Sequence, residues 1–246
     1  MPSEIRAIHR AAAGNNYNKP YIIIMIWKNN LELTELIKIG SIKPLHRSNF
    51  SIIVIDNNDS YPIKQLLLNL DFVVTQFKDI ENIKQLQPFD IIICDIREVG
   101  RAFDSKYGGA YIVKEISLNY PLKYIIICSG STFKVDFNEY FQIADKSIKK
   151  GADLSEWSII LDKAIAELSS PIKIWERTRK YLLTCNISHK IINNIEQEYI
   201  RSYLKGDSKY LSRSIRKNQS LLSNEYVLLS LNTLLNLTTS LISSAL

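Results

Sequence analysis

The stretch that decides the fold is DIIICD, residues 90–95, in which four apolar residues run unbroken between two aspartates. Two similar runs lie on either side of it, SIIVID at 51–56 and YIIICS at 124–129. Short, continuous apolar runs rich in β-branched residues are typical of strands that are buried on both faces of a parallel sheet. These runs therefore predict buried parallel strands.

Further elements alternate with these runs. Additional strands are expected at 72–77 and 141–144, and helices at 63–70, 80–86, 110–118 and 154–168. Alternating strands and helices, with strands apolar on both faces, predict a parallel sheet covered by helices on both sides. The fold class expected over residues 51–168 is therefore α/β, a doubly wound five-stranded parallel sheet.

The composition of the chain limits the classes of protein to which it can belong. The chain has 246 residues and 46% hydrophobic content, which is typical of a globular protein. Its cysteines are odd in number and far apart, and its histidines are scattered, so neither a disulfide framework nor a zinc site is expected. No apolar segment that could serve as a secretory signal follows the first residues, and a reduced, cytoplasmic protein is the expectation. The residues concerned are Cys94, Cys128, Cys185, His9, His46 and His189.

Charge divides the chain near Ser169–Pro171. Residues 171–246 hold eleven Lys or Arg and five Asp or Glu, so they carry the whole net charge of +6. The expected domains are an N-terminal extension (1–50), the α/β domain (51–170) and a basic α-helical domain (171–246). Within the extension we expect a helix at 3–13, a strand at 21–27 and a helix at 31–39. The extension either adds its strand to the edge of the sheet or packs on the C-terminal helices.

Polar residues stand where the predicted strands end. Asp56, Asp95 and Ser129 directly follow apolar runs, and Lys146 follows the fifth and weaker run. Open α/β sheets bind ligands outside the carboxyl edge of their strands, so these side chains are expected in one pocket. Two buried carboxylates require a cation between them, either a lysine or a metal ion. The alternative is that the aspartates cap helices and the lysine is a surface charge.

At these residues the sequence resembles the phosphoacceptor receiver domain of two-component response regulators. IIVIDN at 52–57 is similar to the family's first strand with its acidic pair, and DIIICDI at 90–96 is similar to the third strand with the phosphorylated aspartate. GAYIVKEI at 109–116, IIICSG at 125–130 and ADKS at 144–147 are similar to the following helix, the fourth strand and the lysine motif. The resemblance covers roughly residues 51–168 and implies the flavodoxin-like strand order 2-1-3-4-5.

The resemblance also implies a role for each residue. Asp95 would accept a phosphoryl group from a histidine kinase or phosphotransfer protein, with Lys146 and Ser129 holding the phosphoryl oxygens. Mg²⁺ would be held by Asp56, Asp95, more weakly Asn57, and the backbone carbonyl of Arg97. No enzymatic activity beyond this autocatalytic phosphoryl acceptance and its self-dephosphorylation is expected.

The sequence departs from the family pattern in several places. Asn57 stands where the family has its second acidic residue. The interval from Ser129 to Lys146 is short and leaves little room for the helix between the fourth and fifth strands. These departures favour an alternative function, that of a phosphorylation-independent pseudo-receiver acting as a protein-binding module.

The C-terminal part resembles no output domain that we can name. Helices are expected at 172–184, 189–204, 208–217 and 224–246, and the last has an apolar stripe that favours a bundle or a homodimer. From residue 226 onward no residue is charged, but nine of the 21 are Ser, Thr or Asn, too polar for a convincing membrane span. A third function, nucleic-acid binding, is indicated by a basic cluster with interspersed tyrosines, against the simpler interpretation of a solvated helix face. The cluster comprises Arg201, Tyr203, Lys205, Lys209, Tyr210, Arg213, Arg216 and Lys217.

Overall fold

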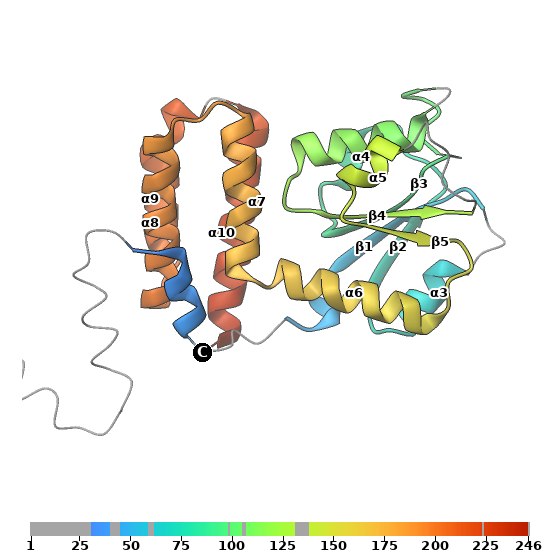
Figure 1. Cartoon of the computed structure of the whole chain (residues 1–246), viewed down its shortest axis with the longest axis horizontal. Helices are drawn as coiled ribbons and strands as arrows, with labels where there is room; N and C mark the ends of the chain where they lie inside the picture. Colours follow the sequence, from blue (N-terminus) through green and yellow to red (C-terminus); the bar gives the residue numbers. More distant parts are fainter. Residues whose placement is uncertain are drawn as a thin grey trace, which may run out of the picture.

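The computed structural model places a five-stranded sheet domain beside a bundle of long helices (Figure 1). It describes residues 31–39, 45–58, 62–97, 99–104, 107–130, 138–222 and 224–245. The helix expected at 3–13 and the strand expected at 21–27 lie outside the described residues.

The sheet is wholly parallel, with the strand order β2-β1-β3-β4-β5. This order confirms the predicted fold class. The central strands β1, β3 and β4 are almost completely buried, as their unbroken apolar sequences predict. The strands are β1 (Ser51–Ile55), β2 (Val73–Phe77), β3 (Ile91–Asp95), β4 (Tyr124–Ser129) and β5 (Lys146–Lys149).

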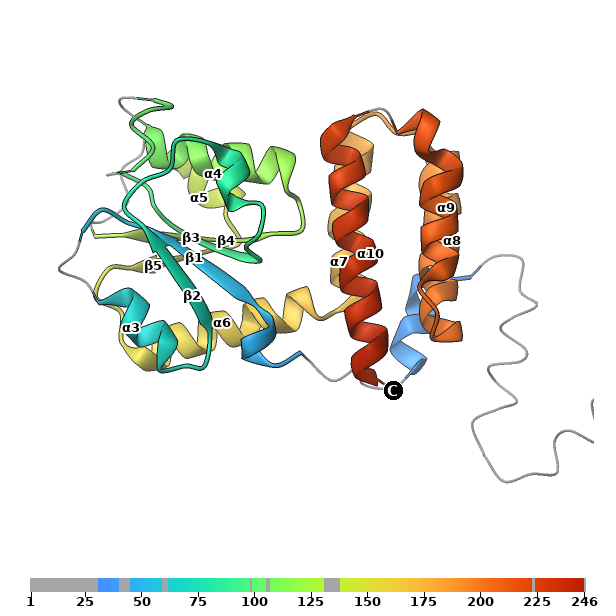
Figure 2. The same ribbon diagram turned by 180° about the vertical axis from the view of Figure 1, so that it is seen from behind.

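Helices cover both faces of the sheet (Figures 1 and 2). Alternate residues of each strand face opposite sides, so the sheet contributes to two separate apolar cores. Ile52, Ile91 and Ile126 pack with α3 (Ile63–Leu68) and α6 (Leu154–Leu168). Ile53, Ile92 and Ile127 pack with the short 3₁₀ helix η3 (Ile83–Leu86) and with α4 (Gly108–Asn119), near α5 (Asn138–Ile143).

The position of the fifth strand was predicted wrongly. Residues 141–144 belong mostly to α5, and β5 begins at Lys146. A short apolar run such as FQIA does not distinguish a strand from one turn of helix by periodicity alone. The true β5 is an edge strand in which half-buried and exposed residues alternate, so it lacks the continuous apolar run of its neighbours.

The C-terminal helices form a bundle with a core of its own. Trp175 stacks on Tyr199, with ring centroids 5.3 Å apart, and both side chains are fully buried. The short 3₁₀ helix η1 (Leu33–Ile39) belongs to this core through Leu36. The elements are α7 (Pro171–Thr184), α8 (His189–Lys205), α9 (Lys209–Asn218), η5 (Gln219–Leu221) and α10 (Glu225–Ala245).

Helix α10 is the one described helix that is long and apolar enough to cross a membrane. Length and composition alone do not separate a membrane span from the core helix of a bundle. Its stripe of Val227, Leu231, Leu234 and Leu241 is fully buried against the other helices. This burial is typical of the central helix of a bundle.

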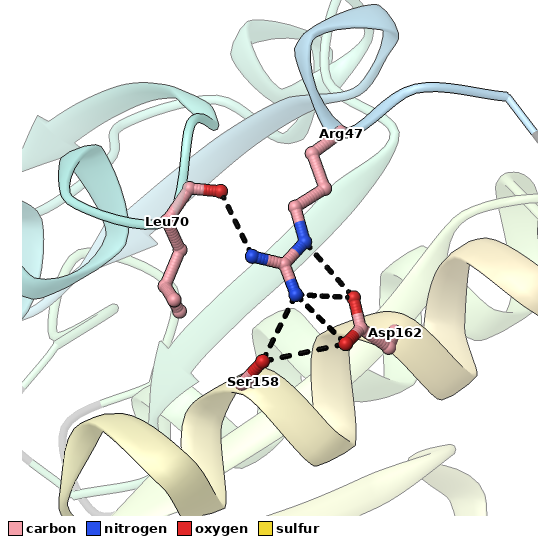
Figure 3. A network of polar contacts seen from close by, with 4 residues as sticks. All are labelled: Arg47, Leu70, Ser158 and Asp162. Carbon is pink, nitrogen blue, oxygen red and sulfur yellow. Dashed lines mark hydrogen bonds and ion pairs between the residues drawn. The ribbon is translucent and has the colours of Figure 1, made fainter.

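One arginine fastens the segment before β1 to the sheet domain (Figure 3). Arg47, in the short 3₁₀ helix η2 (Arg47–Asn49), reaches α6, where its Nη2 atom donates to both carboxylate oxygens of Asp162 at 2.7 Å and to Ser158 Oγ at 2.9 Å. Its Nη1 atom donates to the Leu70 carbonyl at 3.3 Å. The same side chain therefore joins three parts of the chain.

The bundle contacts the sheet domain at the edge where the strands begin. Tyr226 of α10 meets Tyr120 at the end of α4 edge to face, with centroids 5.9 Å apart. Arg177 of α7 pairs with Asp145, the residue before β5, and donates to the carbonyl of Lys123, the residue before β4, at 3.1 Å. The carboxyl edge of the sheet lies at the opposite ends of these strands.

Candidate phosphoacceptor site

Two buried carboxylates lie side by side at the carboxyl edge of the sheet. Asp95 is the last residue of β3 and Asp56 directly follows β1, the neighbouring parallel strand. Their exposed fractions are 3% and 2%. The register pairs Asp95 with Cys128, so Ser129 ends β4 one position further along the same edge. The predicted grouping of these three residues is what the strand register produces.

The cation of this pocket is Lys150, the residue after β5. Its Nζ atom lies 2.6 Å from Oδ2 of Asp95 and 2.9 Å from Oδ1 of Asp56. Burial disfavours the charged form of the ammonium, but hydrogen bonds to Asp95 and Asp56 outweigh it, so the pKa of Lys150 lies above its usual value. The lysine therefore stays protonated and neutralises part of the charge of the two carboxylates.

The prediction that Lys146 lies in this pocket is wrong. Lys146 opens β5 and pairs with Ile126, which places it near the amino end of the strand. The error follows from the misplaced fifth strand, because a strand at 141–144 would have ended just before Lys146. Lys150 comes after the true end of β5, where its backbone N–H donates to the Ser129 carbonyl at 3.0 Å.

Backbone groups orient the carboxylates. Oδ1 of Asp56 accepts a hydrogen bond from the N–H of Asn58 at 2.9 Å, and Oδ1 of Asp95 accepts one from the N–H of Arg97 at 3.1 Å. In each aspartate, one carboxylate oxygen therefore accepts a hydrogen bond from the loop that follows its own strand. In Asp95 the other oxygen is the one held by Lys150.

Helix α4 begins directly against the acceptor strand. A Cβ atom on Gly109 would lie 2.1 Å from the Asp95 carbonyl oxygen, closer than any real contact. Only glycine therefore allows the first turn of α4 to pack on the end of β3. The sequence contained this signal in the Gly108–Gly109 pair.

The pocket fits Mg²⁺ by ligand type but has few charged ligands. Asp56 and Asp95 provide the carboxylate oxygens that Mg²⁺ prefers, while Asn57 is exposed and adds no charge. Among the described residues, no group of three or more His, Cys, Asp or Glu that could hold a metal ion is found. Asp59, the nearest further carboxylate in sequence, lies outside those residues.

The basic cluster expected in the C-terminal domain is divided by the fold. Tyr203 is buried in the bundle core, and Arg201 is bound by Glu198 at 2.6 Å. The remaining cations are exposed on α9 or at the end of α8: Lys205, Lys209, Arg213, Arg216 and Lys217.

The solved structures found by comparison include receiver domains of response regulators, the family that the sequence resembles. A response regulator from Thermotoga maritima matches at 16% identity and a TM-score of 0.39, over 47% of this chain and 97% of that one. A CheY-like receiver domain from Methanospirillum hungatei JF-1 matches at 15% identity and a TM-score of 0.42, over 48% and 95%. The fold assignment itself rests on the strand order and register described above.

A putative response regulator from Chloroflexus aurantiacus J-10-fl matches at 17% identity and a TM-score of 0.40, over 48% of this chain and 98% of that one. No family model and no curated protein matches the sequence. Each of these matches covers about half of this chain and nearly all of the other.

Proposed function

We propose that this chain is a response-regulator-like signalling protein in which phosphoryl acceptance on Asp95 controls the helical bundle. The observation that carries the proposal is the contact of Lys150 with both Asp95 and Asp56 at the carboxyl edge of a 2-1-3-4-5 sheet. A buried carboxylate held against a protonated lysine is a nucleophile whose product, an acyl phosphate, meets a cation already in place.

In the proposed reaction, a carboxylate oxygen of Asp95 attacks the phosphorus of a phosphohistidine or of a small acyl phosphate. The new O–P bond forms as the bond from phosphorus to the leaving group breaks, and the leaving group departs with the bonding electron pair. Lys150 pairs with the added negative charge, and the hydroxyl of Ser129 donates a hydrogen bond to a phosphoryl oxygen. The partner implied is a histidine kinase or a phosphotransfer protein.

Mg²⁺ belongs to the same proposal. The residues that would hold it are Asp56, Asp95 and the backbone carbonyl of Arg97, with Asn57 as a weak ligand. When bound, the ion would neutralise charge on the transferring group. Because Lys150 already neutralises part of this pocket, we expect weak binding of the ion.

The test is incubation of the full chain with acetyl phosphate and Mg²⁺, followed by intact mass measurement. The proposal expects the added mass of one phosphoryl group, absent from Asp95→Ala and present in Asp90→Ala, which changes an aspartate at the other end of β3. An unmodified wild-type mass, or equal modification of Asp95→Ala, contradicts the proposal.

A second candidate function is a pseudo-receiver that binds its partner without phosphorylation. Asn57 favours it, since it stands where the family has the second acidic residue of its pair. Under this alternative the Lys150 ion pairs fasten the pocket in one permanent state. Asp95→Ala would then leave partner binding unchanged, whereas under phosphoryl control it abolishes the response to the donor.

The remaining expectations complete the proposal. The protein would act in the cytoplasm, where its unpaired thiols stay reduced. Self-association would use the bundle. Apart from phosphoryl acceptance and loss at Asp95, no turnover is proposed.

A further inference from the structure

Residues of α8 and α9 line a polar groove. These two helices lie in the part of the bundle farthest from the sheet (Figure 2). Its volume is about 310 Å³. Pockets for small ligands begin at roughly this size. Its lining includes Asn194, Gln197 and Glu198 from α8 with Tyr210, Arg213 and Lys217 from α9.

The groove carries uncompensated positive charge. Arg213 and Lys217 are one helical turn apart on the same face of α9, and both side chains are exposed. Within the described part of the chain, no ion pair involves either one. The carboxylate in the lining, Glu198, is bound by Arg201 at 2.6 Å and is therefore already neutralised. An anion entering the groove would meet two free cations.

Two side chains of the groove, Arg213 and Gln197, have contacts within the bundle that limit their orientations. The Arg213 guanidinium lies over the ring of Tyr210, with its Cζ atom 5.9 Å from the ring centroid. Gln197 is fixed on the opposite wall, because its side chain both accepts from the N–H of Leu31 at 2.6 Å and donates to the carbonyl of Leu31 at 2.9 Å. Pre-organised side chains lose less entropy when a ligand binds.

We infer that this groove binds a small phosphate-bearing ligand of nucleotide size. Arginine presents a planar fork that matches phosphate oxygens, and lysine adds a second charge beside it. The amide of Asn194 provides donor and acceptor groups for the uncharged part of such a ligand. A nucleic-acid strand would instead follow the whole exposed stripe of α9, Arg216 included.

The experiment is isothermal titration calorimetry of the full chain with two probes, inorganic pyrophosphate and ATP, and with single-stranded RNA and DNA oligonucleotides for comparison. The inference expects saturable binding at one site per chain for ATP, and weaker binding of pyrophosphate at the same site. Arg213→Gln and Lys217→Gln should each weaken ATP binding about tenfold, as expected for the loss of one charge-assisted contact.

Arg216→Gln is the matched control, because it removes the same charge from the same helix outside the groove. Its ATP affinity should stay close to that of the wild type. Because all three substituted positions are exposed, the melting temperatures of the three variants should agree. Absence of binding for both probes overturns the inference. So does an equal loss of affinity in Arg216→Gln, or binding confined to RNA and DNA oligonucleotides.

Discussion

Arg177 and Asp145 form an ion pair that joins the helical bundle to the sheet domain at the edge opposite Asp95. The other carboxylate oxygen of Asp145 accepts from the N–H of Ile125 at 2.8 Å, so the pair is attached to the beginning of β4, and Asp145 itself directly precedes β5. At their far ends the same two strands reach Ser129 and Lys150. Strands β4 and β5 therefore run from the pocket to the junction with the bundle.

Removing this junction should loosen the bundle. Arg177→Gln leaves Asp145 half-buried without its cation, and we expect a loss of about 1–2 kcal/mol in the free energy of unfolding. Faster protease cleavage near Ser169 and Ser170, between α6 and α7, should accompany it. Urea unfolding and limited proteolysis measure the two effects. The exposed Arg179→Gln on the same helix is the control, and equal behaviour of the two variants would show that the pair holds nothing together.

Lys150 and Lys146 should differ sharply in their contribution to stability. Lys150→Met leaves two buried carboxylates without a counter-charge, which should cost about 2–4 kcal/mol in urea unfolding. Lys146→Met, at the other end of β5, should change the unfolding free energy by less than about 0.5 kcal/mol. Changing Asp56 and Asp95 to Asn in the Lys150→Met background should restore part of the loss. Similar losses in the two single variants would contradict the assigned position of Lys150.

Gly109 and Gly130 offer a matched pair at the rim of the pocket. Gly109→Ala places a methyl group against the Asp95 carbonyl, and the displacement of α4 should cost about 3 kcal/mol, more than the helix propensity gained. At Gly130 the nearest atom to a new Cβ is 3.7 Å away, so Gly130→Ala should be tolerated. Thermal unfolding of both variants measures the difference in their stability. A stable Gly109→Ala would mean that α4 does not begin against β3.

The half-buried ammonium of Lys123 should make stability depend on pH. Burial lowers its pKa from 10.5 to about 8, although Asp90 acts in the opposite direction. Between these two values the unfolded chain binds the proton more tightly than the folded chain, so the contribution of Lys123 to stability rises with pH.

The comparison that isolates this contribution is wild type against Lys123→Met, unfolded in urea at about pH 7.5 and about pH 9, where tyrosines are still mostly protonated. The difference in unfolding free energy should shift in favour of the wild type at the higher pH. A difference that is constant, or that shifts the other way, would show that Lys123 is not desolvated in the fold.

The central sheet could be predicted from the sequence because its strands are buried on both faces. Such strands need unbroken apolar runs. The runs that form β1, β3 and β4 are each followed by a polar residue that marks the end of the strand. Asp56, Asp95 and Ser129 were therefore placed correctly at one edge. The edge strand β5 is half-exposed and carries no such signal, so its position and that of Lys150 were missed. The short interval between Ser129 and Lys146 was the available clue, since Lys150 leaves room for α5.

The attachment of the bundle had no signal in the sequence. Arg177 and Asp145 are single charged residues whose meeting depends on how α7 leaves α6, and hydrophobic periodicity says nothing about it. Similarly, the sequence shows that basic residues gather in the C-terminal domain, but it does not show which of them share a surface. The fold decided that Tyr203 is buried while Arg213 and Lys217 line a groove.

The most direct test of the central claim compares phosphoryl incorporation from acetyl phosphate in wild type, Lys150→Met and Lys146→Met, with the modified residue located by peptide mass mapping. The account predicts labelling of Asp95 in wild type and Lys146→Met, and a loss of labelling of about tenfold or more in Lys150→Met, which removes the cation that faces the acceptor. Labelling that is unchanged in Lys150→Met, or that maps to another residue, would contradict it.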